Sequence, residues 1–216
     1  MNYIEGLSKN QNRDVLDKAI WQYLARKEIL FCEGDSCRNC YLVTKGCLKL
    51  SKLNTHGAEI IIRFVFPGEM AAAIAVLKKE VYPLTAQAVK PTKVIAWDKN
   101  DFRDLIYKYP DMGFNMLTKL FDRLENLQTR YLELSCEQVH NRIAQFMLYL
   151  IDHAGYKQGK TIYISIPLSR QNIADYIGAS LFTVSRILSN WEKSGWLKSS
   201  YQKVTIMEPD ALKSFK

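Results

Sequence analysis

The chain has 216 residues, of which 48% are apolar, and carries a formal net charge of +8. This length and composition suit one large domain or two small ones with real hydrophobic cores. No run of eighteen apolar residues exists and the start lacks the apolar core of a secretion signal, so we expect a cytoplasmic protein. The charge makes nucleic acid or an acidic membrane surface the first partner classes to consider.

The distribution of charge favours nucleic acid over a membrane. From residue 139 onward the chain has ten Lys and Arg against five Asp and Glu, whereas the first 138 residues have twenty against seventeen. The C-terminal third is therefore the most basic part per residue. We expect no membrane partner.

The first 97 residues predict one short helix followed by a β-rich domain. Apolar residues at helical spacing indicate an amphipathic helix over residues 13–27. From Glu28 to about Trp97 there follow short apolar or alternating runs, separated by turn sequences such as EGDS, NTHG and FPGE. Seven or so strands at this spacing indicate an antiparallel sandwich or jelly roll.

The next part of the chain, from Asp98 to about Asp152, has helical periodicity. Within it six residues are spaced 3-4-3-4-3, as in the a/d seam of a coiled coil. A helix packed against its own domain fits the same spacing, but the long, narrow and charge-flanked stripe favours self-association of two chains. The six residues are Leu117, Leu120, Leu124, Leu127, Tyr131 and Leu134.

The C-terminal segment LSRQNIADYIGASLFTVSRILSNWEKSGWLKSSYQKVTIM predicts a helix-turn-helix with a wing. Ser169 can cap a first helix, Gly178 permits a turn, and Ser180 can cap a second helix that ends at Gly195. The following residues alternate between apolar and polar across YQK, which indicates a small hairpin. A short helix, a three-residue turn and a second helix are typical of DNA-binding proteins.

The outward residues of this motif suit double-stranded operator DNA. Arg186 is the best candidate for reading a base, because its guanidinium matches the two acceptors of guanine. Phe182 or Leu181 can touch a thymine methyl group, whereas Arg170 and Gln171 suit backbone phosphates. The full set of predicted DNA-binding residues is Ser169, Arg170, Gln171, Ser180, Leu181, Phe182, Thr183, Ser185 and Arg186.

Three segments together resemble the CRP/FNR family of bacterial transcription regulators: GDSCRNCYLVTKGCLKL at 34–50, FPGE at 66–69 and SRQNIADYIGASLFTVSRIL at 169–188. The resemblance covers essentially the whole chain and is most specific in the last segment. It implies an α+β fold with a cyclic-nucleotide-binding-type antiparallel jelly roll, a long dimerisation helix and a winged helix-turn-helix. The expected domains are residues 1–110, 111–138 and 139–216, and the expected partners are a second copy of the chain, operator DNA and RNA polymerase.

The resemblance also implies an effector pocket, for which cyclic AMP is a poor occupant. In members that bind cyclic nucleotides, a Gly-Glu segment contacts the ribose and an Arg-Ser/Thr-Ala segment holds the phosphate. Here Gly68 and Glu69 match the first segment, but Leu84 stands where the arginine of the second would be, before Thr85. A buried phosphate without its cation carries a severe desolvation cost. The candidate effector pocket therefore consists of Gly68, Glu69, Met70, Leu84 and Thr85.

Haem is a second candidate for the sensor. The stretch EMAAAIAVLKKEVYPLTAQAVKPTKV, with the later KLFDRL, is especially similar to regulators of denitrification that respond to nitric oxide through haem. Its apolar part can line a pocket for a flat cofactor or can be packed jelly-roll core. None of the three histidines, His56, His140 and His153, is convincingly placed as an axial ligand, and we expect all three at the surface.

Four of the five cysteines fall within FCEGDSCRNCYLVTKGC, at Cys32, Cys37, Cys40 and Cys47. The first three are spaced like ligands of a plant-type [2Fe–2S] cluster, for which Cys47 or Cys136 would be the fourth. A redox-active thiol pair, Cys32 with Cys37 or Cys37 with Cys40, is an alternative. Because only residues 33–39 are free to be irregular, we favour packing of small buried side chains on strands.

These features together predict a homodimeric, sequence-specific transcription regulator controlled by an effector other than cyclic AMP. The alternative is a redox, iron–sulfur or haem-dependent sensor that uses Cys32, Cys37 and Cys40. An enzyme is not expected, because the chain shows no Ser-His-Asp set, phosphate-cradling glycine loop or paired carboxylates.

Overall fold

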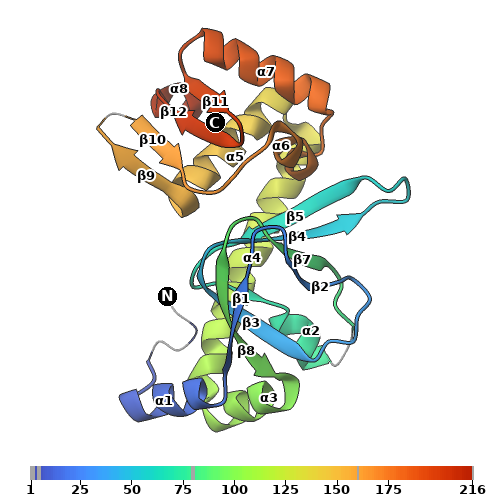
Figure 1. The fold of residues 1–216 in the computed structure, drawn as a ribbon, viewed down its shortest axis with the longest axis vertical. Coiled ribbons are helices and arrows are strands. Elements are labelled where there is room, and N and C mark those ends of the chain that lie inside the picture. Colours follow the sequence, from blue (N-terminus) through green and yellow to red (C-terminus); the bar gives the residue numbers. More distant parts are fainter. Residues whose placement is uncertain (1–2, 4–5, 79–80, 160, 216) are drawn as a thin grey trace. The chain divides into compact units, whose positions relative to one another are not determined.

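The computed structural model describes residue 3 and residues 6–78, 81–159 and 161–215 (Figure 1). Residues 79 and 80 of the stretch considered for haem, and residues 1, 2, 4, 5, 160 and 216, lie outside the described part. The chain forms two compact units, residues 1–52 with 62–127 and residues 53–61 with 128–216. Within the described residues, no helix is both long and apolar enough to cross a membrane.

The N-terminal part of the chain contains most of the strands. Its elements are α1 (Lys9–Asp17), β1 (Ile20–Leu24), β2 (Ile29–Phe31), β3 (Asn39–Lys45), β4 (Leu48–Leu53), β5 (Glu59–Val65), β6 (Met70–Ala71), α2 (Ala73–Lys78), β7 (Thr85–Ala88), β8 (Thr92–Asp98) and α3 (Lys99–Lys108). The strands form two four-stranded sheets, ordered β1-β8-β3-β6 and β2-β7-β4-β5 (Figure 1). The strand pairs whose register is defined are antiparallel, which confirms the predicted β-roll.

The predicted helix over residues 13–27 is wrong in its second half. The helix α1 begins after Ser8, whose side chain accepts a hydrogen bond from the backbone of Gln11, and ends at Asp17. Residues 20–24 instead form β1, which pairs with β8 in the register Ile20 to Ala96. The apolar residues of this segment fit both periods, and pairing with a neighbouring strand decides between them.

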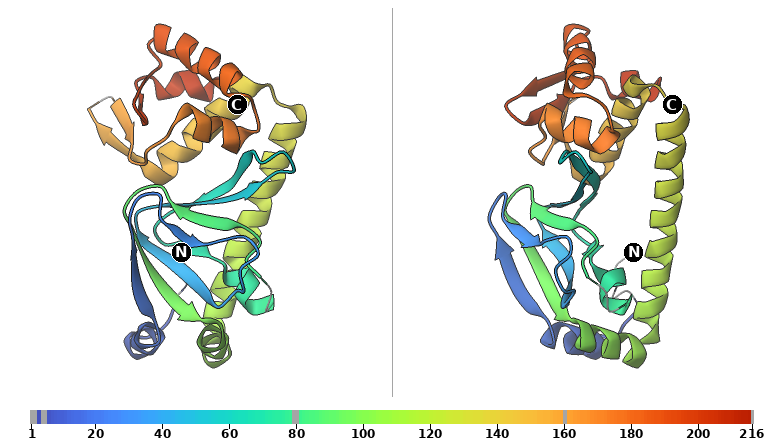
Figure 2. Two further views of the ribbon diagram at one scale, coloured as in Figure 1. Left: turned by 45° about the vertical axis from the view of Figure 1, so that its right-hand side comes forward. Right: turned by 90° about the vertical axis from the view of Figure 1, so that its right-hand side faces the viewer.

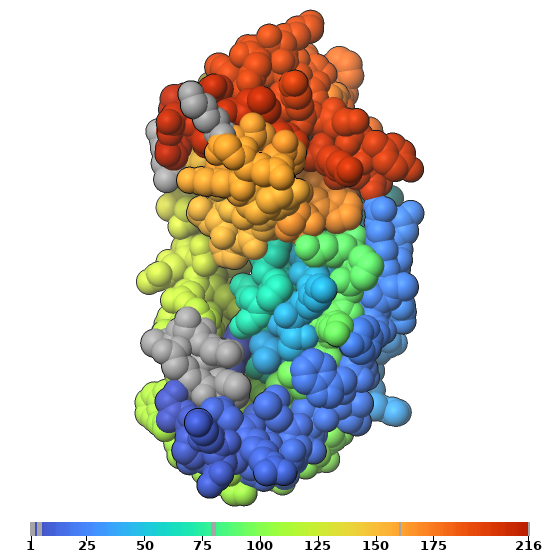
Figure 3. Space-filling model, turned by 60° about the vertical axis from the view of Figure 1, so that its left-hand side comes forward, coloured from blue at the N-terminus to red at the C-terminus, as the bar shows by residue number. Residues whose placement is uncertain are grey.

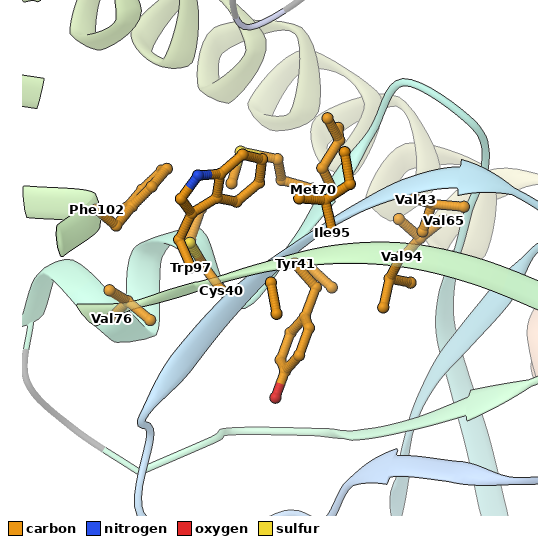
Figure 4. Close-up of a cluster of buried hydrophobic side chains, with 14 of the residues drawn as sticks. Cys40, Tyr41, Val43, Val65, Met70, Val76, Val94, Ile95, Trp97 and Phe102 are labelled. Carbon is orange, nitrogen blue, oxygen red and sulfur yellow. The ribbon is translucent and has the colours of Figure 1, made fainter. Parts of the chain in front are cut away.

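The β-roll is held by a continuous hydrophobic core. The strand β3 lies between β8 and β6 and is buried from Cys40 to Val43, so its run CYLV is apolar throughout. Figure 4 shows Cys40 and Tyr41 of β3 among side chains of β8, including Val94 and Trp97. The core also fixes α1, because the indole N–H of Trp97 donates to the carbonyl of Val15 at 2.8 Å.

The long helix α4 (Pro110–Cys136) begins just after α3 and is uninterrupted along its length (Figure 2). Its 27 residues correspond to about 40 Å at 1.5 Å per residue. Only Met112 of this helix is buried, so most of its apolar side chains have no cover within the chain. A helix of this kind is typical of an interface with another molecule.

The C-terminal elements are α5 (Val139–Ala154), β9 (Gly155–Gln158), β10 (Thr161–Ile164), α6 (Arg170–Ile177), α7 (Leu181–Lys193), β11 (Leu197–Ser200), β12 (Lys203–Ile206) and α8 (Pro209–Lys213). The strands form one sheet in the order β11-β12-β10-β9. Every residue of β9 is exposed, and β9 and β10 form an orange surface patch in Figure 3. The helix-turn-helix and its wing are present as predicted.

The turn between β3 and β4 allows a direct test of the packing of the β-roll. Gly46 has φ of +97°, and an added Cβ would lie 2.5 Å from the Cα of Thr92 and 2.6 Å from the carbonyl oxygen of Pro91. Gly46→Ala should therefore add an overpacking cost of about 1–3 kcal/mol to the left-handed strain of about 1–2 kcal/mol. Urea unfolding measures both.

Gly34→Ala is the matched control, because Gly34 has φ of +87° but no described atom within 4 Å of the added Cβ. Its loss of stability should be the strain alone, about 1–2 kcal/mol. Equal losses for the two variants would contradict the close approach at Gly46.

Candidate nucleic-acid interface

The helix-turn-helix is built from two capped helices and a glycine. The hydroxyl of Ser169 accepts from the backbone N–H of Asn172 at 3.0 Å and so caps α6. Gly178 ends α6 in the left-handed conformation, with φ of 67° and ψ of 47°. Ser180 then caps α7 by accepting from the backbone N–H of Thr183 at 3.1 Å. Both predicted caps and the predicted turn are present.

Buried side chains on both helices fix the outward face of α7. Ile173, Ala174 and Ile177 of α6 are buried, as are three residues of α7. The buried residues of α7 are Val184, Leu188 and Trp191. With one face of α7 held in this way, the opposite face is available to a partner.

The predicted reading residues lie on that available face. Arg186 is exposed, the side chains of Leu181 and Phe182 are 45% and 76% exposed, and Thr183 and Ser185 are partly exposed. No acidic residue occupies the first turn of α7. The face combines one guanidinium, hydroxyls and apolar groups, which are the side-chain types that read base edges in a major groove.

Arg170 differs from its predicted role as a phosphate contact. Its guanidinium donates to the carbonyl of Ser185 at 3.2 Å, the hydroxyl of Ser189 at 3.1 Å and the carboxylate of Glu192 at 3.0 Å. It also donates to the hydroxyl of Ser199 on β11 at 3.3 Å. With four partners inside the unit, Arg170 holds α6, α7 and the wing together rather than presenting a free charge.

Gln171 is exposed but already donates to the carboxylate of Asp175 at 2.6 Å. A phosphate contact by Gln171 would therefore replace that hydrogen bond.

The wing is the hairpin of β11 and β12, and its tip was not singled out as a site from the sequence. Tyr201 and Gln202 form the tip with φ of 37° and 67°, and Tyr201 is 95% exposed. Two consecutive left-handed residues match the type I′ turn that joins strands tightly. The backbone N–H of Leu168 donates to the carbonyl of Gln202 at 2.8 Å, which fixes the wing beside the start of α6.

In the β-roll, the carboxylate of Glu69 is hydrogen-bonded within its own turn. It accepts from the backbone N–H of Phe66 at 2.8 Å, and Gly68 has φ of +87°. The sequence FPGE is therefore a closed turn before β6, in which one oxygen of the Glu69 carboxylate takes part. The hydroxyl of Thr85 likewise accepts from the backbone N–H of Glu33 at 3.0 Å.

The other two candidate pocket residues are largely covered. Met70 is 2% exposed and Leu84 is partly buried against the core. The carbonyl of Met70 accepts from the guanidinium groups of Arg63 at 2.8 Å and Arg123 at 2.9 Å. Arg123 also donates to the phenol of Tyr3 at 3.0 Å. Both arginines lie outside the set predicted from the sequence, because nothing in the local sequence pairs β5 with α4.

The apolar stretch MAAAIAV does not show the features of a haem site. Met70, Ala71, Ala73, Ala75 and Val76 are buried in the core of the β-roll. All three histidines belong to the C-terminal unit, so the unit that contains this stretch supplies no imidazole ligand. A haem held by histidine therefore has no ligand from the unit that contains this stretch.

The cysteines do not fit a cluster either. Cys37, Cys40 and Cys47 are buried, whereas Cys32 and Cys136 are exposed. Burial raises the pKa of the Cys37 and Cys40 thiols and raises that of Cys47 to about 12. Among the described residues no three His, Cys, Asp or Glu side chains are grouped so that they could hold a metal ion. These thiols pack as small apolar side chains on or beside strands.

Comparison with known proteins adds two family matches. Residues 21–109 match the cyclic nucleotide-binding domain, and residues 141–215 match the Crp-like helix-turn-helix domain. Together the matches include most of the β-roll and nearly all of the helix-turn-helix unit.

Several curated proteins are similar over most of their length. The chain is 26% identical to the transcriptional activator protein FnrA of Stutzerimonas stutzeri, over 92% of this chain and 82% of that protein. It is 22% identical to a CRP-like cAMP-activated global transcriptional regulator of Mycobacterium tuberculosis, over 87% and 84%. The structure of FixK2 from Bradyrhizobium japonicum has the same fold, with a TM-score of 0.78, 22% identity and coverage of 92% and 97%.

The burial of the cysteines predicts a pattern of thiol reactivity. Of the four cysteines between residues 31 and 47, only Cys32 should react rapidly with a thiol reagent in the native protein. Because the pKa of Cys47 is raised to about 12, raising the pH from 7 to 10 should leave it protonated and unlabelled. Pulse alkylation followed by mass spectrometry of the peptides measures each site.

Full denaturation should make all four thiols reactive, which controls for the reagent. Fast labelling of Cys37 or Cys40 in the native state would contradict the packed arrangement and would favour the hypothesis of a redox-active thiol pair.

Proposed function

Because the chain belongs to the CRP/FNR family of DNA-binding transcription regulators, we propose that it acts as a homodimer on a two-fold symmetric operator. Members of this family regulate transcription and are not enzymes. The observation that carries the proposal is the outward face of α7. Arg186 and Phe182 are exposed on this face, while buried side chains on the opposite face pack α7 against its own unit. The predicted DNA-binding residues remain part of this proposal, with Arg170 as a residue that positions α6, α7 and the wing.

The exposed apolar face of α4 supports the homodimer. Nine large apolar side chains along this helix are 40–70% exposed. All six residues of the predicted seam are among them, and the nine are Phe114, Leu117, Leu120, Phe121, Leu124, Leu127, Tyr131, Leu132 and Leu134. Burying one such side chain completely is worth about 1.5–3 kcal/mol, so a second α4 is a suitable cover. We assign residues 111–138 to dimerisation, between a sensor at 1–110 and a DNA reader at 139–216.

The β-roll supports an effector other than cyclic AMP. Leu84 and Thr85 provide no cation for a phosphate, and the carboxylate of Glu69 is bonded within its own turn. Cyclic AMP would bury its phosphate without the charge that such a group requires. The proposed effector acts by biasing the dimer toward or away from operator binding.

Operator DNA and RNA polymerase are the proposed partners, in the cytoplasm. The similarity to FnrA, which is named as a transcriptional activator, favours activation as the outcome. Activation requires that the DNA-bound dimer assist RNA polymerase at the promoter, and we include this contact in the proposal.

Replacement of Arg186 tests the reading face. Arg186→Ala should reduce the preference for the operator over unrelated DNA about 5- to 100-fold, because the guanidinium supplies discrimination at guanine. Fluorescence anisotropy with operator and scrambled duplexes at fixed salt gives the ratio of affinities.

The control is Lys193→Ala, which removes an exposed charge from the last turn of α7. Lys193 lies outside the predicted reading residues, so its replacement should leave the ratio of affinities for the two duplexes unchanged. If Arg186→Ala keeps the wild-type preference, Arg186 does not read the operator.

Charges placed on the α4 face test the homodimer. The double change Leu124→Glu and Leu127→Glu should convert the dimer to a monomer, because burying two unpaired carboxylates outweighs the remaining apolar contact. Native mass spectrometry reports the assembly directly.

Thr129→Glu adds a carboxylate at an exposed position about 140° around the helix from Leu124 and about 160° from Leu127, off the seam, and should leave the dimer intact. A double variant that remains dimeric at micromolar concentration would place the interface elsewhere.

A further inference from the structure

The outward stripe of α7 contains a large apolar side chain with no cover. At 100° per residue, Phe182 lies roughly 160° around the helix from the buried Val184. The Phe182 side chain is 76% exposed, the highest value among the large apolar side chains of α7. Leu181 is 45% exposed and lies only about 60° from Val184, so it is at the edge of the stripe. Exposure of a phenyl ring at this point has no role in packing α7 against its own unit.

Phe182 and Arg186 are neighbours on this stripe, because they are four residues apart on the same face. The neighbouring polar groups of the first turn are already engaged, since the hydroxyls of Ser180 and Thr183 are 2.9 Å apart. The beginning of α7 therefore offers a phenyl ring and a guanidinium side by side, without an acidic group in the first turn. A partner for this pair must present an apolar patch next to hydrogen-bond acceptors.

The major groove offers one apolar group on a base edge, the 5-methyl group of thymine, and guanine offers the two acceptors that a guanidinium fits. We infer that Phe182 is the contact site for the 5-methyl group of a pyrimidine in each half-site, beside the guanine read by Arg186. The inference rests on the proposed operator binding and specifies what the operator must contain.

The spacing of the two side chains limits where the methyl group lies. Four residues of helix advance about 6 Å, and successive base pairs are about 3.4 Å apart. The methylated pyrimidine therefore lies within about two base pairs of the guanine. Because the methyl group alone is recognised, 5-methylcytosine at that position satisfies the contact as thymine does.

The experiment begins with selection of a preferred operator from random DNA by the full-length protein. The pyrimidines near the selected guanine are then varied singly in four forms: thymine, deoxyuridine, cytosine and 5-methylcytosine. Thymine against deoxyuridine and 5-methylcytosine against cytosine each change only the methyl group. Fluorescence anisotropy at one salt concentration measures the affinity of each duplex.

For the wild-type protein, the methyl group should raise affinity about fourfold for each half-site in both comparisons, from about 0.8 kcal/mol per buried apolar carbon. Phe182→Ala should bind the paired duplexes equally. Asn190→Ala is the control, because Asn190 is exposed on the same helix but lies outside the predicted reading residues, and it should keep the fourfold difference. Both changes are at the surface, so urea unfolding of the variants should match the wild type.

Three results would overturn the inference: a wild-type protein indifferent to the methyl group, Phe182→Ala with the difference retained, or Asn190→Ala with the difference lost. Failure of the proposed function looks different, because selection would then yield no preferred sequence. That result would remove the inference together with the function it rests on.

Discussion

The apolar face of α4 is the constraint on which the rest of the structure depends. Leu117, Leu124 and Leu127 are about half exposed, and Phe121 and Tyr131 are exposed still further. Monomeric proteins rarely leave a continuous apolar stripe of this length in water. The stripe explains why the chain is built around a single uninterrupted helix of 27 residues. Pairing of two such helices gives the assembly a two-fold axis, which a symmetric operator shares.

In the C-terminal unit, the side chains that hold the helices together differ from those that face outward on α7. Arg170, which looks like a DNA contact in the sequence, is held by Glu192 and three other partners. It connects both helices to the wing and so keeps α7 in a fixed orientation. In the proposed function, recognition falls to exposed side chains of α7, chiefly Arg186 and Phe182. Specific DNA binding needs this division, because a reading helix that shifts by one residue turns its side chains away from the base edges.

In the β-roll too, several polar groups of the predicted pocket are hydrogen-bonded within the protein. Glu69 closes a turn, Thr85 caps a loop, and the backbone carbonyl of Met70 accepts from both Arg63 and Arg123. These contacts hold the first half of α4 against the strands that precede it.

The sequence predicted the elements whose signals are local. The caps at Ser169 and Ser180, the turn at Gly178 and the alternation of the wing are all present, since each depends on a few neighbouring residues. The segment 20–24 was predicted as helix because its apolar residues fit that period, and only its register with β8 makes it a strand. The partners of Arg170 and Arg123 were missed for the same reason. They come from distant positions in the chain, and no local pattern reveals them.

The central claim is that two copies joined through α4 place two α7 helices on one face of the DNA. Hydroxyl-radical footprinting on the selected operator tests this most directly, because it maps protected sugars base by base. A dimer joined in this way should give two equivalent protected regions related by a two-fold axis, with centres about 34–36 Å apart, one turn of the duplex. A single protected region, or two regions whose spacing is not a multiple of one turn, would contradict it.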